Sequence, residues 1–168
     1  AALRATLTPE AQQRIDSIPT ENLEALEAYF LGRQSMVTRR LSDLANAAMR
    51  FEEAVSRDPN FALAFVGLAD TYLLQAGYGG LRWEEGIAKS KAAAEQALKL
   101  DPGLGEAYAA TAKRTSWEGD TEGAEIAFKQ AIQLNPNYAP AYQWYGEMLA
   151  DCCDRFSEAL ELSRKATE

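Results

Sequence analysis

The stretch AEIAFKQAIQLNPN, residues 124–137, decides the fold class because it joins a helix-packing spacing to a helix-ending proline. Ala124, Phe128 and Ala131 follow one another at intervals of four and three residues, which places their side chains on one face of a helix. Small residues there let a second helix approach closely, and the aromatic ring fills the space between the two helices. Pro136 ends the run. The stretch therefore predicts the second helix of an antiparallel pair.

The same pattern occurs at three further places along the chain. The prolines stand in the contexts Asp58-Pro59-Asn60, Asp101-Pro102-Gly103 and Asn135-Pro136-Asn137. The other sets with this spacing are Ala47, Phe51 and Ala54; Ser90, Ala94 and Ala97; and Ala159, Ser163 and Ala166. Pro102 and Pro136 are 34 residues apart, whereas Pro59 and Pro102 are 43 apart, as if nine residues had been inserted. The pattern predicts four helical hairpins, the last of them cut short.

The helix that precedes each set also carries a small residue where two helices would cross. These close-contact pairs are Leu31-Gly32, Leu68-Ala69, Thr111-Ala112 and Tyr145-Gly146. With its 34-residue period, the sequence over residues 23–168 resembles the tetratricopeptide repeat family, although Ala28, Phe65, Tyr108 and Tyr142 replace its tryptophan. The resemblance implies an all-α fold, a right-handed superhelix (α-solenoid) of antiparallel helix pairs. The repeats would cover about 23–59, 60–102, 103–136 and 137–168.

A narrower resemblance rests on Leu7-Thr8-Pro9-Glu10, on residues 19–25 and 29–33, and on residues 58–70. These stretches are similar to repeats that follow class III adenylate or guanylate cyclases, winged-helix transcriptional regulators or protein kinases in bacterial signalling proteins. The resemblance implies a sensory or assembly module of a larger signalling protein, with residues 1–22 as the last helix and linker of a preceding domain. It does not identify that domain or the compartment.

Composition limits the chemistry of the chain. Lys and Arg number 17 against 25 Asp and Glu, and the net charge of −8 repels a phosphate backbone, so nucleic acid is not an expected partner. There is no histidine, the commonest general base and transition-metal ligand. The adjacent Cys152 and Cys153 are better explained as two small, semi-buried hydrophobic residues on a helix than as a metal or redox site. No cofactor is predicted, and no apolar run approaches the roughly 20 residues that span a membrane.

Local signals predict where helices begin and where the repeats are irregular. Thr8-Pro9-Glu10, Thr20-Glu21, Asn60 and Asn137 are predicted helix starts, and Asp120 is a predicted cap after a tight turn at Gly119. The turn at residues 38–41 is three residues longer than expected, and residues 75–83 form the insertion. The glycines at 77, 79 and 80 lack the Lys-Ser/Thr of a phosphate-binding loop, so a lengthened hairpin covered by Tyr78 and Trp83 is favoured.

In stacked hairpins the first helix of each pair lines a concave face, which is where a partner would bind. The residues predicted to contact the partner there are Tyr29, Arg33, Met36, Val37, Val66, Asp70, Leu73, Ala109, Lys113, Trp117, Gln143, Glu147 and Asp151. Trp117 is the strongest candidate anchor because tryptophan is over-represented at interface hot spots. The alternative is that Trp117 packs near the turn at Gly119.

The sequence therefore predicts a protein–protein interaction scaffold that binds a peptide or partner domain. Self-association into a homodimer is the main alternative, and an apolar patch on the convex face or the terminal helix would favour it. An enzyme is a remote alternative, because acidic pairs such as Glu52-Glu53 diverge on a helix.

Overall fold

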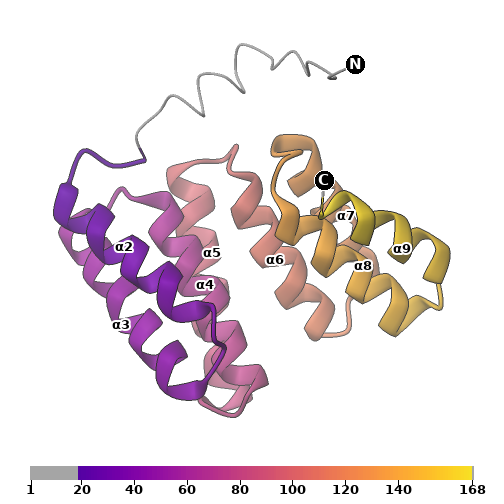
Figure 1. Ribbon diagram of the computed structural model, residues 1–168, viewed down its shortest axis with the longest axis horizontal. Coiled ribbons are helices and arrows are strands. Elements are labelled where there is room, and N and C mark those ends of the chain that lie inside the picture. Colours follow the sequence, from indigo (N-terminus) through magenta and orange to yellow (C-terminus); the bar gives the residue numbers. More distant parts are fainter. Residues whose placement is uncertain (1–18, 168) are drawn as a thin grey trace.

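The computed structural model describes residues 19–167, and within this range the chain forms eight helices and no strand (Figure 1). The helices are α2 (Leu23–Met36), α3 (Leu41–Arg57), α4 (Ala62–Gly77), α5 (Trp83–Leu100), α6 (Gly105–Trp117), α7 (Thr121–Leu134), α8 (Ala139–Cys153) and α9 (Phe156–Lys165). None of these helices is both long enough and apolar enough to cross a membrane. The helix predicted at the start of the chain and the signal at Thr8 lie outside the described residues.

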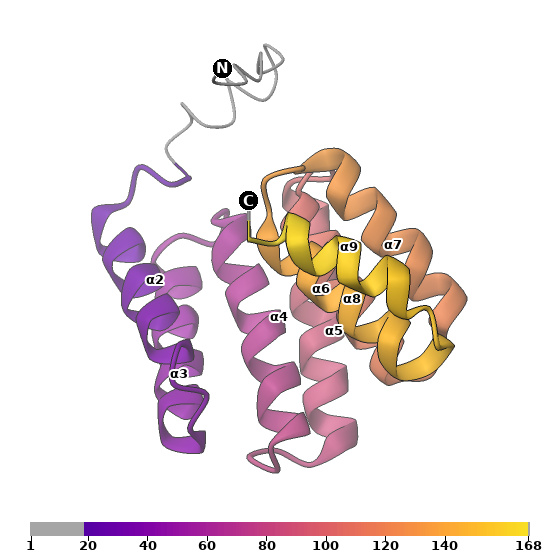
Figure 2. The ribbon, with the colours of Figure 1, turned by 45° about the vertical axis from the view of Figure 1, so that its right-hand side comes forward.

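The helices form consecutive hairpins. Helix α2 packs with α3, α4 with α5, α6 with α7 and α8 with α9, and each second helix contacts the first helix of the next hairpin. The first helices also contact one another, α2 with α4, α4 with α6 and α6 with α8. The hairpins follow one another in chain order across the molecule (Figures 1 and 2). The first helices therefore make one continuous row, as the predicted concave face requires.

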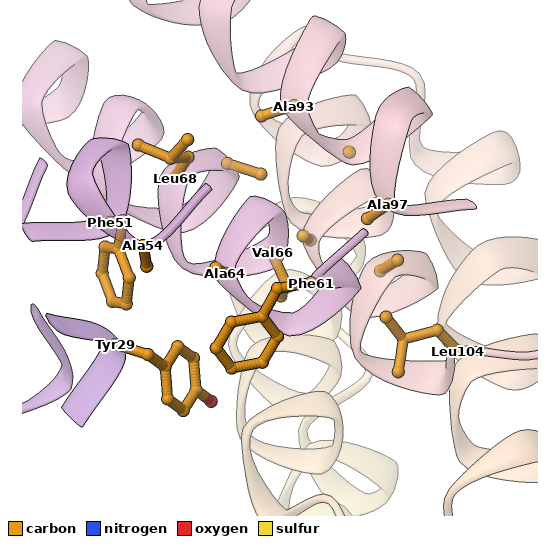
Figure 3. Close-up of a cluster of buried hydrophobic side chains, with 14 of the residues drawn as sticks. Tyr29, Phe51, Ala54, Phe61, Ala64, Val66, Leu68, Ala93, Ala97 and Leu104 are labelled. Atoms are coloured by element: carbon orange, nitrogen blue, oxygen red, sulfur yellow. The ribbon is translucent and has the colours of Figure 1, made fainter. Parts of the chain in front are cut away.

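The first part of the core is built around Phe51, which is completely buried. A Cβ atom on Gly32 or Gly67 would come within 2.8 or 2.5 Å of the Phe51 ring, so α2, α3 and α4 can meet here only because these residues are glycines. Tyr29 lies against both Phe51 and Phe61, with ring centroids 5.8 and 5.0 Å apart (Figure 3). The small residue predicted at position 32 thus has the predicted packing role.

The second part of the core repeats this arrangement with different residues. Phe128 of α7 is completely buried and stacks on Tyr145 of α8, with ring centroids 5.4 Å apart. In α9 only Ala159 of the predicted packing set is buried, whereas Ser163 is exposed. No helix pair follows α9 within residues 19–167, so this face of the last helix has no further hairpin to cover it there.

The proline motifs close the hairpins with Asx turns. In each motif the side chain of the residue before proline accepts the backbone N–H of the residue after it: Asp58 from Asn60 at 2.9 Å, Asp101 from Gly103 at 2.9 Å and Asn135 from Asn137 at 3.1 Å. Asn60 and Asn137, which were predicted as helix starts, lie in these turns, and helices α4 and α8 begin two residues later.

Two other helix starts have side-chain caps. Asn22, rather than the predicted Thr20, caps α2 by accepting the N–H groups of Glu24 and Ala25. The prediction for Asp120 is confirmed: its side chain accepts the N–H of Gly123 at 2.9 Å, directly after the turn in which Gly119 has a φ of 90°.

Candidate functional site

Two adjoining hollows lie along the row of first helices. The first, which we call the Arg33 hollow, has a volume of about 230 Å³ and lies between α2, α4 and the starts of α6 and α8. The second, the Lys113 hollow, has a volume of about 260 Å³ and lies between the later parts of α4, α6 and α8. The hollows share Arg39, Asp70, Leu74 and Trp144. Because of these shared walls we treat the two hollows together as one groove.

Most of the residues predicted to contact a partner line this groove. Those in the Arg33 hollow are Tyr29, Arg33, Met36, Val37 and Val66, with Asp70 shared. Those in the Lys113 hollow are Leu73, Lys113, Trp117, Glu147 and Asp151. Ala109 is the exception that needs correction, because it is completely buried among the alanines of α7 and α8 and cannot contact a partner. Gln143 is exposed outside both hollows and donates to Glu147 at 3.0 Å.

Several residues that line the groove were not predicted from the sequence. Tyr138 and Trp144 come from the start of α8, and Glu106 comes from the start of α6. Arg39 lies in the turn between α2 and α3 and has the left-handed φ of 53°, which is uncommon for a residue other than glycine. The three extra residues of that turn were a sequence signal for Arg39. The other three lie on or next to the first helices α6 and α8, which were expected to line the groove, but at positions other than those predicted.

The Lys113 hollow is organised around one paired lysine. The Nζ atom of Lys113 lies 2.8 Å from Oε2 of Glu147 and sits over the rings of Trp117 and Trp144, 5.3 and 5.9 Å from their centroids. Burial opposes the charge of Glu147, but the hydrogen bond and charge of Lys113 outweigh it and lower the pKa of this carboxyl. The charges of this hollow's central pair are thus satisfied within the chain.

Trp117 packs against the insertion at residues 75–83. Its ring stacks on Trp83 with centroids 6.0 Å apart, and a Cβ atom on Gly77 would come within 2.6 Å of it. Trp117 therefore packs against the α4–α5 turn, not against the turn at Gly119, while it also lines the Lys113 hollow. The residues of the insertion position this aromatic wall of the groove.

The Arg33 hollow contains charged side chains, Arg33 and Asp70, that form no ion pair within residues 19–167. The Oδ1 atom of Asp70 is buried and has no hydrogen-bond partner within residues 19–167. Burial raises the pKa of Asp70 to about 7, although the charges of Arg33 and Lys113 act to lower it. Among the described residues, the one hydrogen bond that Arg33 donates is long, 3.5 Å, to the hydroxyl oxygen of Tyr29. Burial also holds the pKa of Tyr138 well above its usual value, so this phenol is a neutral wall.

Comparison with known proteins supports the repeat assignment. A model of the tetratricopeptide repeat family matches residues 118–138, which include α7. No curated protein sequence matches the chain. The crystal structure of TTC0263, a thermophilic TPR protein of Thermus thermophilus, shares 18% identity over 94% of this chain and 76% of that chain, with a TM-score of 0.71. The crystal structure of MamA shares 18% identity over 94% and 84%, with a TM-score of 0.56.

At this level of identity the two structures show the fold alone. They confirm the predicted all-α helical-repeat architecture, and the match to the tetratricopeptide repeat family is limited to residues 118–138.

Proposed function

We propose that the chain is a protein–protein interaction module whose groove binds an extended segment of a partner protein. The observation that supports this most directly is the continuity of the two hollows along all four first helices. Ligand sites are typically concave and mostly apolar, with a few polar groups that fix orientation. The groove has this character, since aromatic rings from α2, α6 and α8 alternate in it with Arg33, Asp70 and Lys113.

The rigidity of the groove also supports binding. Trp117 is backed by Trp83, and Lys113 is fixed by Glu147 and two indole rings. Side chains that are ordered before binding lose little entropy when a ligand arrives. Tryptophan anchors in such settings carry much of the energy of protein interfaces. The Lys113 hollow is therefore the part of the groove that we expect to hold apolar side chains of the partner.

The wider context is a proposal that rests on sequence resemblance alone. Residues 58–70 and 29–33 resemble repeats of bacterial signalling proteins that carry a cyclase, winged-helix or kinase domain. On that basis we infer that this module senses or assembles partners for such an output domain and has no catalytic role of its own.

The experiment that tests the proposal is selection of a random peptide library on the immobilised protein. Leu74 is a wall of both hollows, so the substitution Leu74→Arg should fill the groove and weaken the selected peptides about tenfold or more. The matched control is Met49→Arg on the outer helix α3, where Met49 is 65% exposed. This control should leave binding unchanged. No enriched peptide, or equal loss in both variants, would contradict a groove site.

Self-association is a second candidate function, favoured by one feature of α9. Phe156 and Leu160 lie one turn apart on this helix and are 62% and 54% exposed. A second copy that covers these side chains would bury apolar surface on the terminal helix. A light-scattering mass that rises with concentration in the wild type, but not in a Phe156→Ser and Leu160→Ser double variant, would establish this function independently of the groove.

A further inference from the structure

Arg33 and Asp70 line the same hollow from two neighbouring first helices. Arg33 is on α2 and Asp70 on α4, and no ion pair joins them within the part of the chain that the structure describes. The buried Oδ1 of Asp70 lacks a donor there, and the guanidinium of Arg33, with five N–H groups, makes one long hydrogen bond. The hollow therefore presents one unmet acceptor and several unmet donors to whatever enters it.

The surrounding charges disfavour a charged ligand group at this place. A carboxylate that entered to reach Arg33 would also meet Asp70 and Glu106, which line the same hollow. An ammonium or guanidinium group that entered to reach Asp70 would meet Arg33 and Arg39, with Lys113 in the adjoining hollow. Repulsive groups of this kind exclude ligands as effectively as attractive ones select them.

A neutral group that carries a hydrogen-bond donor and an acceptor at the same end can pair with both Asp70 and Arg33. A carboxamide provides an N–H for the Asp70 oxygen and a C=O for Arg33. The main-chain peptide unit carries the same groups, but its trans geometry points them in opposite directions, so it cannot present both to one hollow. The methylene groups of the side chain would lie along Tyr29, Val66 and Trp144.

From this geometry we propose that the Arg33 hollow selects the carboxamide side chain of an asparagine or glutamine in the bound segment. The inference rests on the proposed function, because it assigns a specificity to the same groove. Asp70 accepts the amide N–H, and Arg33 donates to the amide oxygen. The adjoining Lys113 hollow holds a neighbouring apolar residue of the segment.

The test uses the peptides enriched from the random library. A synthetic peptide with Gln or Asn at the enriched position is compared with versions that carry Glu, Lys or Leu there, by fluorescence anisotropy at about pH 8, where the carboxyl of Asp70 is ionised. Wild-type protein should bind the carboxamide version about tenfold more tightly than each of the others, as expected for hydrogen bonds to charged partners. With Asp70→Leu, which removes both the acceptor and the charge, the preference over Leu should disappear.

A second variant keeps the test decisive if Asp70→Leu does not fold, which circular dichroism will show. Asp70→Asn keeps a hydrogen-bonding group without the charge, so the carboxamide peptide should still bind, while discrimination against Glu should fall to about twofold or less. Enrichment of charged residues at this position, or a carboxamide preference that Asp70→Leu leaves intact, would overturn the inference while the groove itself stands. If no peptide is enriched at all, the proposed function fails together with it.

Discussion

Two carboxylates of this chain have opposite surroundings. Glu125 of α7 accepts hydrogen bonds from Arg155 at 2.7 Å and from the hydroxyl of Tyr145 at 2.8 Å, and it lies 2.7 Å from Nζ of Lys129. Asp70 of α4 has a buried oxygen with no donor among residues 19–167. The hydrogen bonds from Arg155 and Lys129 lower the pKa of Glu125 to about 2, whereas burial raises the pKa of Asp70 to about 7. The surroundings of Glu125 stabilise its anionic form, whereas burial disfavours the anionic form of Asp70.

This difference separates a region that holds the fold together from a region that is ready for a ligand. Glu125 joins α7 to α8 and to the residue before α9, so its hydrogen bonds fasten the last two hairpins. The buried oxygen of Asp70 fastens nothing in the described chain, and an unsatisfied buried polar group costs folding free energy. Costs of this kind occur where function requires them. Within the groove, the unsatisfied oxygen of Asp70 therefore lowers the stability of the fold.

The largest expected effect is on the pH dependence of stability through Asp70. Its pKa in the folded chain lies above the usual value of 3.8, so the folded chain retains a proton that the unfolded chain loses. Stability should therefore fall as the pH rises from 3.8 to about 7, by on the order of 4 kcal/mol. In Asp70→Asn this decrease should be absent. Urea unfolding of both proteins across this pH range measures it.

The comparison between the two proteins at each pH removes the titration of every other acid, including Glu125. The cations that face Asp70, Arg33 of α2 and Lys113 of α6, remain in both. At about pH 4 the variant and the wild type should be equally stable, and at about pH 8 the variant should be the more stable. If the free energies of unfolding of the two proteins changed in parallel with pH, the Asp70 carboxylate would have a partner that offsets its burial.

A smaller effect of opposite sign is expected at Glu125. Tyr145→Phe removes one hydrogen bond to this carboxylate but keeps the ring that stacks on Phe128. The pKa of folded Glu125 is lowered from 4.5 to about 2, so its stabilising effect is present above pH 4.5 and is lost as the pH falls through 2. We expect the variant to lose about 1 kcal/mol at neutral pH and less in acid. A loss that is the same at both ends of this range would point to packing instead.

The sequence predicted the parts of this comparison that depend on the repeat. Spacing alone placed Phe51 and Phe128 in the core and Asp70 on the concave side, because a helix fixes which residues share a face. It placed Ala109 on the same side wrongly, since α7 and α8 pack against that turn of α6 and bury it.

The partners of the two carboxylates could not be predicted in the same way. Glu125 meets Arg155 across 30 residues of chain, whereas the buried oxygen of Asp70 has no partner in the described chain because Arg33, on another helix, stops short of it. Both outcomes depend on distances between helices, which local spacing does not determine. For the same reason Tyr138 and Trp144, which enter the groove from α8, were missed.

The smallest expected effect on stability is at Lys129, the exposed partner of Glu125, in contrast to its buried partner Tyr145. Lys129 is 63% exposed and lies one turn from Glu125 on α7, so Lys129→Ala should cost about 0.3–0.5 kcal/mol at low salt and less at high salt. Lys91→Ala on α5 is the matched control, because Lys91 is similarly exposed, at 58%, but lies 3.9 Å from Glu95. Both substitutions change helix propensity equally, so the difference between them, measured by urea unfolding, gives how much more the close pairing of Lys129 with Glu125 contributes than the looser pairing of Lys91 with Glu95. A difference as large as that of Tyr145→Phe would mean that charge, more than buried hydrogen bonding, distinguishes the Glu125 region from the groove.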